Sequence, residues 1–151
     1  TDGGMYYSEN GDELKKFNTK DGMGVQLLRE YGINTIIITG ENVEMVKRRG
    51  QKLKIDEIYL GIKDKAPLVR EIAQEHNIDL SQVAYIGDDI NDLESIEIVG
   101  LGCSVSDGME EVKNAAKYIT KTKGGQGALR EVAELIIRAK LGDNLIWINL
   151  L

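Results

Sequence analysis

The sequence has little cysteine, no excess of positive charge and no long apolar run, and each absence excludes a class of protein. Cys103 is the single cysteine, so no internal disulfide framework can form, and we expect this thiol to pack as a small hydrophobic group. The formal net charge of −6 argues against nucleic acid or an anionic membrane as a general partner. No apolar run approaches the ~20 residues that span a bilayer, and the first residues show no secretory signal pattern. These features predict a cytoplasmic protein.

The order of the predicted elements indicates one α/β domain, which 151 residues can supply with a real core. Asn10-Gly11, between short runs that contain aromatic residues, predicts a β-hairpin. Short apolar strands then alternate with helices, which predicts a three-layer, Rossmann-like α/β sandwich with a mostly parallel sheet. We divide the single domain into a hairpin flap (1–18), an α/β core (19–140) and an apolar tail (141–151). The tail is expected to pack on the sheet edge or on another subunit.

Two acidic positions are predicted to cap helices that follow them directly. Asp21 stands at the start of a helix that should end at Gly32. Asp107 and Glu110 are three residues apart, the spacing of a capping box, before a helix that should contain Val112. Each prediction uses only the local sequence.

The densest group of acidic residues follows the strand predicted at 83–86. Asp88, Asp89 and Asp92 stand where this strand passes into a helix, the kind of position at which open α/β sheets bind ligands. Clustered carboxylates repel one another unless a cation or a helix N-terminus absorbs the charge, and Mg²⁺ is one such cation. Asp89 and Asp92 are explained equally well as helix-capping residues, whereas Asp88 is not. Both interpretations stay open from these residues alone.

Three predicted strand ends carry polar residues that can meet at one edge of the sheet. Thr39 ends the strand at 35–38, Lys65 opens the helix after the strand at 58–60, and Asp88 ends a third strand. Together they offer a hydrogen-bond donor for phosphate, a fixed cation and a metal carboxylate. Phosphoryl transfer requires this combination, because its catalysis is mostly positioning and charge stabilisation.

These motifs resemble those of the haloacid dehalogenase superfamily of phosphatases. Ile38-Thr39-Gly40, Lys65, and Gly87-Asp88-Asp89 with Asp92 are similar to its second, third and fourth motifs. More narrowly, the chain resembles the branch that hydrolyses phosphates of 3-deoxy-2-ulosonic acids, the sugar acids of lipopolysaccharide or sialic acid biosynthesis. The segments that carry this narrower resemblance are Thr1-Asp2-Gly3-Gly4, Lys16-Phe17-Asn18 and Lys123-Gly124-Gly125-Gln126-Gly127. The members are the eight-carbon 3-deoxy-D-manno-octulosonate (KDO) 8-phosphate phosphatases and the nine-carbon KDN and sialic acid 9-phosphate phosphatases.

The resemblance implies a Mg²⁺-dependent phosphoric monoester hydrolase that works through an aspartyl-phosphate intermediate. Lys65 and Thr39 would be catalytic, and Asp88 and Asp92 would bind the metal. Contacts to the sugar phosphate would come from Gly40, Glu41, Lys52, Asp89, Gly124 and Gly125. Glu41 follows Thr39-Gly40 where the eight-carbon branch typically has Arg and the nine-carbon branch has Glu. The residues themselves equally allow Glu41 and Lys52 to be ordinary surface groups.

In this family the nucleophile and the general acid/base lie in an Asp-x-Asp-Gly motif, and residues 1–151 contain none. We expect these aspartates just before Thr1, on a central strand of ~5–6 residues. Without them the chain could hold Mg²⁺ and phosphate but could not attack. An alternative is a non-catalytic tetramerisation module of the same fold, as in some sialic-acid cytidylyltransferases. For the phosphatase, the resemblance implies a capless homotetramer in which the hairpin docks on a neighbour.

Overall fold

The structure, a computed structural model, describes residues 1–11, 13–55 and 57–141. The apolar tail therefore lies outside the described residues beyond Leu141, and its packing stays a prediction. The elements in chain order are β1 (Met5–Tyr7), β2 (Glu13–Lys15), α1 (Thr19–Glu30), β3 (Ile36–Ile38), α2 (Glu44–Lys52), β4 (Glu57–Tyr59), α3 (Lys65–Glu75), η1 (Leu80–Gln82), β5 (Ala84–Gly87), η2 (Ile90–Asp92), α4 (Leu93–Ile98), β6 (Leu101–Ser104), α5 (Glu110–Ala115), β7 (Tyr118–Ile119) and α6 (Ala128–Leu141).

The strands form two parallel ladders and one antiparallel hairpin. β3 pairs with β4 through Ile37 and Ile58, and β5, β6 and β7 form the second ladder in that order. The predicted alternation of parallel strands and helices is confirmed, but the expected single sheet is divided. In the part of the chain that the structure describes, β3 pairs only with β4, and β5 pairs only with β6.

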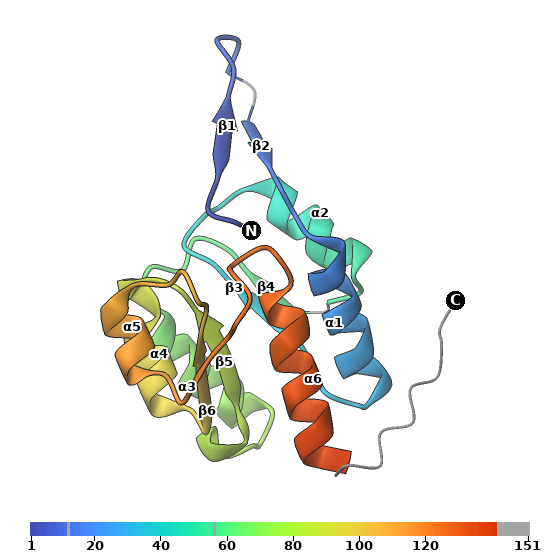
Figure 1. The fold of residues 1–151 in the computed structure, drawn as a ribbon, viewed down its shortest axis with the longest axis vertical. Coiled ribbons are helices and arrows are strands. Elements are labelled where there is room, and N and C mark those ends of the chain that lie inside the picture. The colour runs from blue at the N-terminus through green and yellow to red at the C-terminus, as the bar shows by residue number, and fades with distance from the viewer. Residues whose placement is uncertain (12, 56, 142–151) are drawn as a thin grey trace.

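The helices form two groups, with α1, α2 and α6 on one side of the molecule and α3, α4 and α5 on the other (Figure 1). α1 and α6 pack along each other around Leu28, Ala133 and Ile137, all buried. They approach closely because α1 carries Gly24, where a Cβ would lie 2.9 Å from the backbone of α6. No helix among the described residues is both long enough and apolar enough to cross a membrane.

The hairpin β1–β2 projects from the body of the protein, as predicted (Figure 1). Its large apolar side chains, Met5, Tyr6, Tyr7 and Leu14, are exposed.

Cys103 lies fully buried in β6, and burial raises the pKa of its thiol to about 11. This confirms that the single cysteine packs as a hydrophobic group.

Both predictions of local helix capping were wrong. Asn18 caps α1 by accepting a hydrogen bond from the Lys20 N–H at 2.9 Å, while Asp21 accepts from the Gly127 and Leu129 N–H groups at the start of α6. α5 has no side-chain cap, and Asp107 accepts from the Gly124 N–H at 2.8 Å. The carboxylates bind donors far along the chain, which no local pattern can report.

Candidate active site

A buried ion pair lies at the carboxyl end of β5. Lys65, the first residue of α3, places its Nζ 2.6 Å from Oδ1 of Asp92 in the η2 turn. Both side chains are at least nine-tenths buried. A buried lysine is stable only with a close negative partner, so Asp92 fixes the position of this cation.

Asp92 accepts hydrogen bonds on both of its carboxylate oxygens. The Tyr85 hydroxyl donates to Oδ1 at 2.7 Å, and the backbone N–H groups of Asp88 and Asp89 approach Oδ2 at 3.1 and 3.4 Å. Burial, followed by the charge of Asp92, raises the pKa of Tyr85, so the phenol stays protonated as a donor. Gly87 is required here, because a Cβ would lie 2.4 Å from the Asp92 side chain.

The carboxylate of Asp88 lies beside the Lys65–Asp92 pair. It has no hydrogen bond or ion pair with the described residues. Although its side chain reaches the surface, partial desolvation raises its pKa, and the neighbouring charges of Asp92 and Asp89 raise it further. Lys65 opposes the shift. An unpaired oxygen ligand in a negatively charged site fits a hard cation such as Mg²⁺. In the part of the chain that the structure describes, no three acidic, His or Cys side chains gather into a complete metal site.

Asp89 has the capping role that its position allowed. It is the N-cap of η2 and accepts a hydrogen bond from the Ile90 N–H at 2.7 Å, and the Asp92 side chain accepts from the Asp89 N–H in return. Of the three clustered acids, Asp88 alone therefore has no structural hydrogen bond to its carboxylate in the described residues. Its role as a metal ligand, like that of Asp92, stays a prediction.

The loop Thr39-Gly40-Glu41 continues β3 toward the start of α3. The Thr39 carbonyl accepts from the Ile62 N–H at 2.9 Å, three residues before Lys65, and the Thr39 Oγ1 accepts from the Glu41 N–H at 3.2 Å. The Glu41 carboxylate contacts the Lys15 ammonium of the hairpin. Lys52 is the last residue of α2, so about 13 Å of helix separates it from the end of this loop. Thr39, Gly40 and Glu41 lie together on this loop, and the role of Lys52 stays a prediction.

The glycine loop Gly124–Gly127 is held by carboxylates on either side. Asp107 accepts from the Gly124 N–H, and Asp21 accepts from the Gly127 N–H. Gly125 has a φ of 64°, and a Cβ there would lie 2.2 Å from the carbonyl carbon of Thr1. The glycine loop and Thr1 are therefore neighbours.

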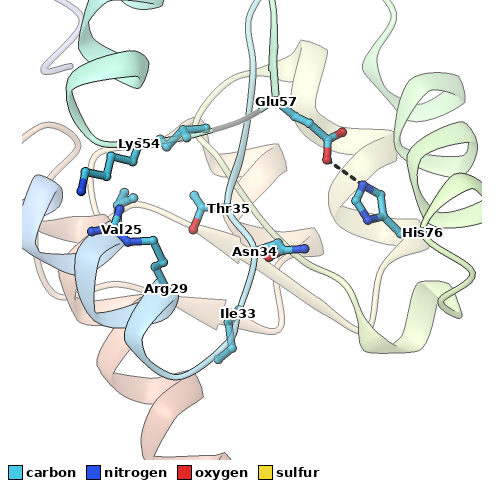
Figure 2. A pocket seen from close by; sticks show the side chains of 9 residues that line it. Val25, Arg29, Ile33, Asn34, Thr35, Lys54, Glu57 and His76 are labelled. Carbon is cyan, nitrogen blue, oxygen red and sulfur yellow. Dashed lines mark hydrogen bonds and ion pairs between the residues drawn. The ribbon is translucent and has the colours of Figure 1, made fainter.

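A separate hollow of about 250 Å³ lies at the amino ends of β3 and β4, the opposite edge from Thr39 (Figure 2). Figure 2 shows Arg29 and Lys54 on one side and the pair of His76 and Glu57 on the other. The His76 Nε2 lies 2.7 Å from the Glu57 Oε1. His76 therefore contacts β4 rather than a residue of the candidate site.

Sequence reasoning missed Lys15, Tyr85 and Asp107, which contact residues of the candidate site directly. Tyr85 offered a weak signal, because a hydroxyl-bearing aromatic stands in a short strand immediately before the acidic cluster. Lys15 and Asp107 offered none, since their partners lie 26 and 17 residues away in the chain. These contacts follow from how the loops meet.

Comparison with known proteins gives the same family as the motifs. A family model for haloacid dehalogenase-like hydrolase matches residues 57–132, about half of the chain. The 3-deoxy-D-manno-octulosonate 8-phosphate phosphatase of Yersinia pestis is 39% identical over 140 residues, covering 93% of this chain and 75% of that protein.

Two solved structures of such phosphatases share the fold. The enzyme from Moraxella catarrhalis, crystallised with magnesium ion, phosphate ion and KDO, has a TM-score of 0.89 and 43% identity, covering 91% of this chain and 79% of that chain. The cobalt-bound enzyme from Haemophilus influenzae has a TM-score of 0.88 and 33% identity, covering 93% and 82%. The chain therefore belongs to the haloacid dehalogenase-like hydrolases.

Proposed function

We propose that this protein is a Mg²⁺-dependent phosphatase that hydrolyses the phosphate ester of an eight- or nine-carbon 3-deoxy-2-ulosonic acid. The observation that carries the proposal is the buried Lys65–Asp92 ion pair beside the unpaired carboxylate of Asp88. A fixed cation and a free metal ligand at one strand end suit a phosphoryl group and its counterion. Similarity to octulosonate 8-phosphate phosphatases over more than nine-tenths of the chain supports the substrate class.

Each residue of the site has a proposed role in this reaction. Lys65 stabilises the charge of the transferring phosphoryl group, and Asp92 holds its ammonium in place. The Thr39 hydroxyl and the backbone at Gly40 bind phosphoryl oxygens, and Asp88, supported by Asp92, provides the metal carboxylate. Bound Mg²⁺ would neutralise charge on the phosphate oxygens. The attacking aspartate is expected just before Thr1, which lies against Gly125 of the glycine loop.

The sugar is proposed to contact the residues around this phosphate position. Gly124 and Gly125 are neighbours of Thr1, and Asp89 follows Asp88 directly. Glu41 lies on the same loop as Thr39 and favours a nine-carbon sugar, whereas the named relatives act on an eight-carbon one. Lys52, the last residue of α2, is proposed to contact the end of the sugar farther from the phosphate.

The assembly and the location are also proposals. The exposed apolar hairpin supports a homotetramer in which it docks on a neighbour. A reduced, buried Cys103 and the net negative charge suit the cytoplasm.

Release of inorganic phosphate tests the proposed activity. The protein that carries Asp-x-Asp-Gly ahead of Thr1 should hydrolyse KDO 8-phosphate or KDN 9-phosphate with Mg²⁺ and stop when EDTA is added. Lys65→Met should lose at least ~10²-fold in kcat, as for removal of one charge-stabilising group. Lys63→Met, at an exposed neighbouring lysine, serves as the matched control. Failure to hydrolyse either sugar phosphate would overturn the proposal, and a stable tetramer without turnover would favour the tetramerisation module.

A further inference from the structure

Lys15 is a hairpin residue whose ammonium group meets the candidate active site. It is the last residue of β2, opposite Met5 in the register of the hairpin. Its side chain is only 8% exposed, unusual for a lysine, and its Nζ contacts Oε2 of Glu41, whose side chain is 38% exposed. The aliphatic part of Lys15 is therefore buried, and its ammonium group is placed against the Glu41 carboxylate.

Glu41 is tied to the phosphate-binding end of the site by backbone contacts. Its N–H donates to the Thr39 Oγ1 at 3.2 Å, and its carbonyl accepts from the Gly61 N–H at 3.2 Å. The second carboxylate oxygen, Oε1, has no bonded partner among the described residues, so it is free to accept a hydrogen bond from a ligand. A movement of the Glu41 side chain would therefore change the surface beside Thr39.

Charge decides what this arrangement can recognise. A sugar acid phosphate carries a carboxylate and a phosphate, and an unneutralised Glu41 would repel both. Paired with Lys15, Glu41 keeps an oxygen for a sugar hydroxyl while the pair has no net charge. The Lys15–Glu41 pair therefore suits a polyhydroxy acid better than an unpaired Glu41 carboxylate or an apolar surface would.

We propose that Lys15 is a positioning residue for sugar recognition, because it orients and neutralises Glu41 against the hydroxyl groups of the substrate. This inference rests on the proposed function. It also makes the base of the hairpin a wall of the active site. The phosphoryl group itself is held elsewhere, by Thr39 and Lys65, so the loss of Lys15 acts mainly on substrate affinity.

Steady-state kinetics on two substrates tests this role in the protein that carries the nucleophile. Lys15→Met should raise KM for the ulosonate phosphate by about tenfold, the size of one lost charge-assisted contact, with kcat changed far less. The KM for p-nitrophenyl phosphate, which has no sugar hydroxyls, should rise much less. Lys15→Arg should recover part of the affinity, and Lys15→Met added to Glu41→Gln should cost little more than Glu41→Gln alone.

Lys16→Met is the matched control, because this adjacent lysine is exposed and pairs with Asp2 instead. An equal rise in KM for both substrates, or an additive effect with Glu41→Gln, would show a merely structural role and overturn the inference. An unchanged KM in Lys15→Met, with wild-type activity present, would overturn this inference alone. Wild-type protein that hydrolyses p-nitrophenyl phosphate but no ulosonate phosphate would overturn the proposed function and this inference with it.

Discussion

At the scale of single residues, Asp88 links the stability of the protein to pH and to metal. Its pKa is raised in the folded state, so the folded protein binds this proton more tightly than the unfolded chain does. The resulting stabilisation is present below the ordinary carboxyl pKa and is lost as pH rises through the raised value. Above that value the ionised carboxylate therefore opposes folding until a cation binds it.

We predict that Asp88→Asn increases the free energy of unfolding at pH 7 without divalent metal, and that this gain shrinks toward about pH 4. Added Mg²⁺ should stabilise the wild-type protein and not the variant, because a ligand stabilises only the state that binds it. Urea denaturation at both pH values, with and without Mg²⁺, measures this. Asp64→Asn, at an exposed position whose side chain makes no capping bond, should change neither property. A variant less stable than wild type at pH 7 without metal would contradict the prediction.

Asp21 gives a second prediction at this scale. Its carboxylate accepts from the Gly127, Leu129 and Arg130 N–H groups, so it caps α6 from a position in α1. Asp21→Ala should lower the free energy of unfolding by about 1–2 kcal/mol, the usual cost of losing a helix cap. Asp64→Ala should lower the free energy of unfolding by almost nothing. Asp64 occupies the N-cap position of α3, but its side chain makes no capping hydrogen bond. Equal losses in urea denaturation would refute the long-range cap.

At the scale of elements, α1 carries two glycines that face different neighbours, Gly24 against α6 and Gly22 against Arg49 of α2. A Cβ at Gly24 would lie 2.9 Å from the Arg130 Cα, which is backbone and cannot yield locally. A Cβ at Gly22 would meet the guanidinium end of Arg49 at 2.7 Å, which is flexible. Gly24→Ala should therefore cost about 1–3 kcal/mol through overpacking.

Gly22→Ala should cost less, because the gain in helix propensity of about 0.5–1 kcal/mol offsets the displaced side chain. Comparing the thermal midpoints of the two variants measures the difference. A larger loss in Gly22→Ala than in Gly24→Ala would show that the helices separate easily and that the close approach is unimportant.

The elements were predictable because each strand and helix is specified by a local pattern. Each of these signals is contained in a short stretch of sequence. Examples are the β-branched run of β3, the Asn-Gly turn of the hairpin and the non-helical residues before Lys65. The same locality explains the two wrong caps. Asp21 and Asp107 have donors 106 and 17 residues away, and those donors exist only once α6 and the glycine loop are in place.

The candidate site was predictable to the extent that it lies at strand ends. Thr39 and Asp88 follow strands directly and Lys65 opens the helix after a third strand, so their positions at the carboxyl edge could be inferred. The ion pair of Lys65 with Asp92 could not be inferred, because it depends on how α3 meets the η2 turn.

At the scale of the whole molecule, the parallel strands form two separate ladders instead of one sheet. Consecutive strands in a chain often pair with each other, but not always. Here β4 and β5 are consecutive, and the connection through α3 leads from one ladder to the other. The resemblance predicts a further central strand, and β3 and β5 each keep an edge without a strand partner in the described residues. Thr1 lies against Gly125 of the loop that precedes α6.

The hairpin carries the last prediction, which concerns assembly. A two-stranded hairpin is marginally stable alone, and this one exposes Tyr6 and Tyr7, at 57% and 64%, away from the body. If it docks on a neighbour, the double variant Tyr6→Ser/Tyr7→Ser should convert the tetramer to smaller species, as measured by size-exclusion chromatography with light scattering. Ile78→Ser, which removes an exposed apolar side chain after α3, should leave the tetramer intact. A monomeric wild-type protein would refute the tetramer, and a tetramer that survives the double variant would place its interface elsewhere, because burial of these tyrosines would then contribute nothing to association.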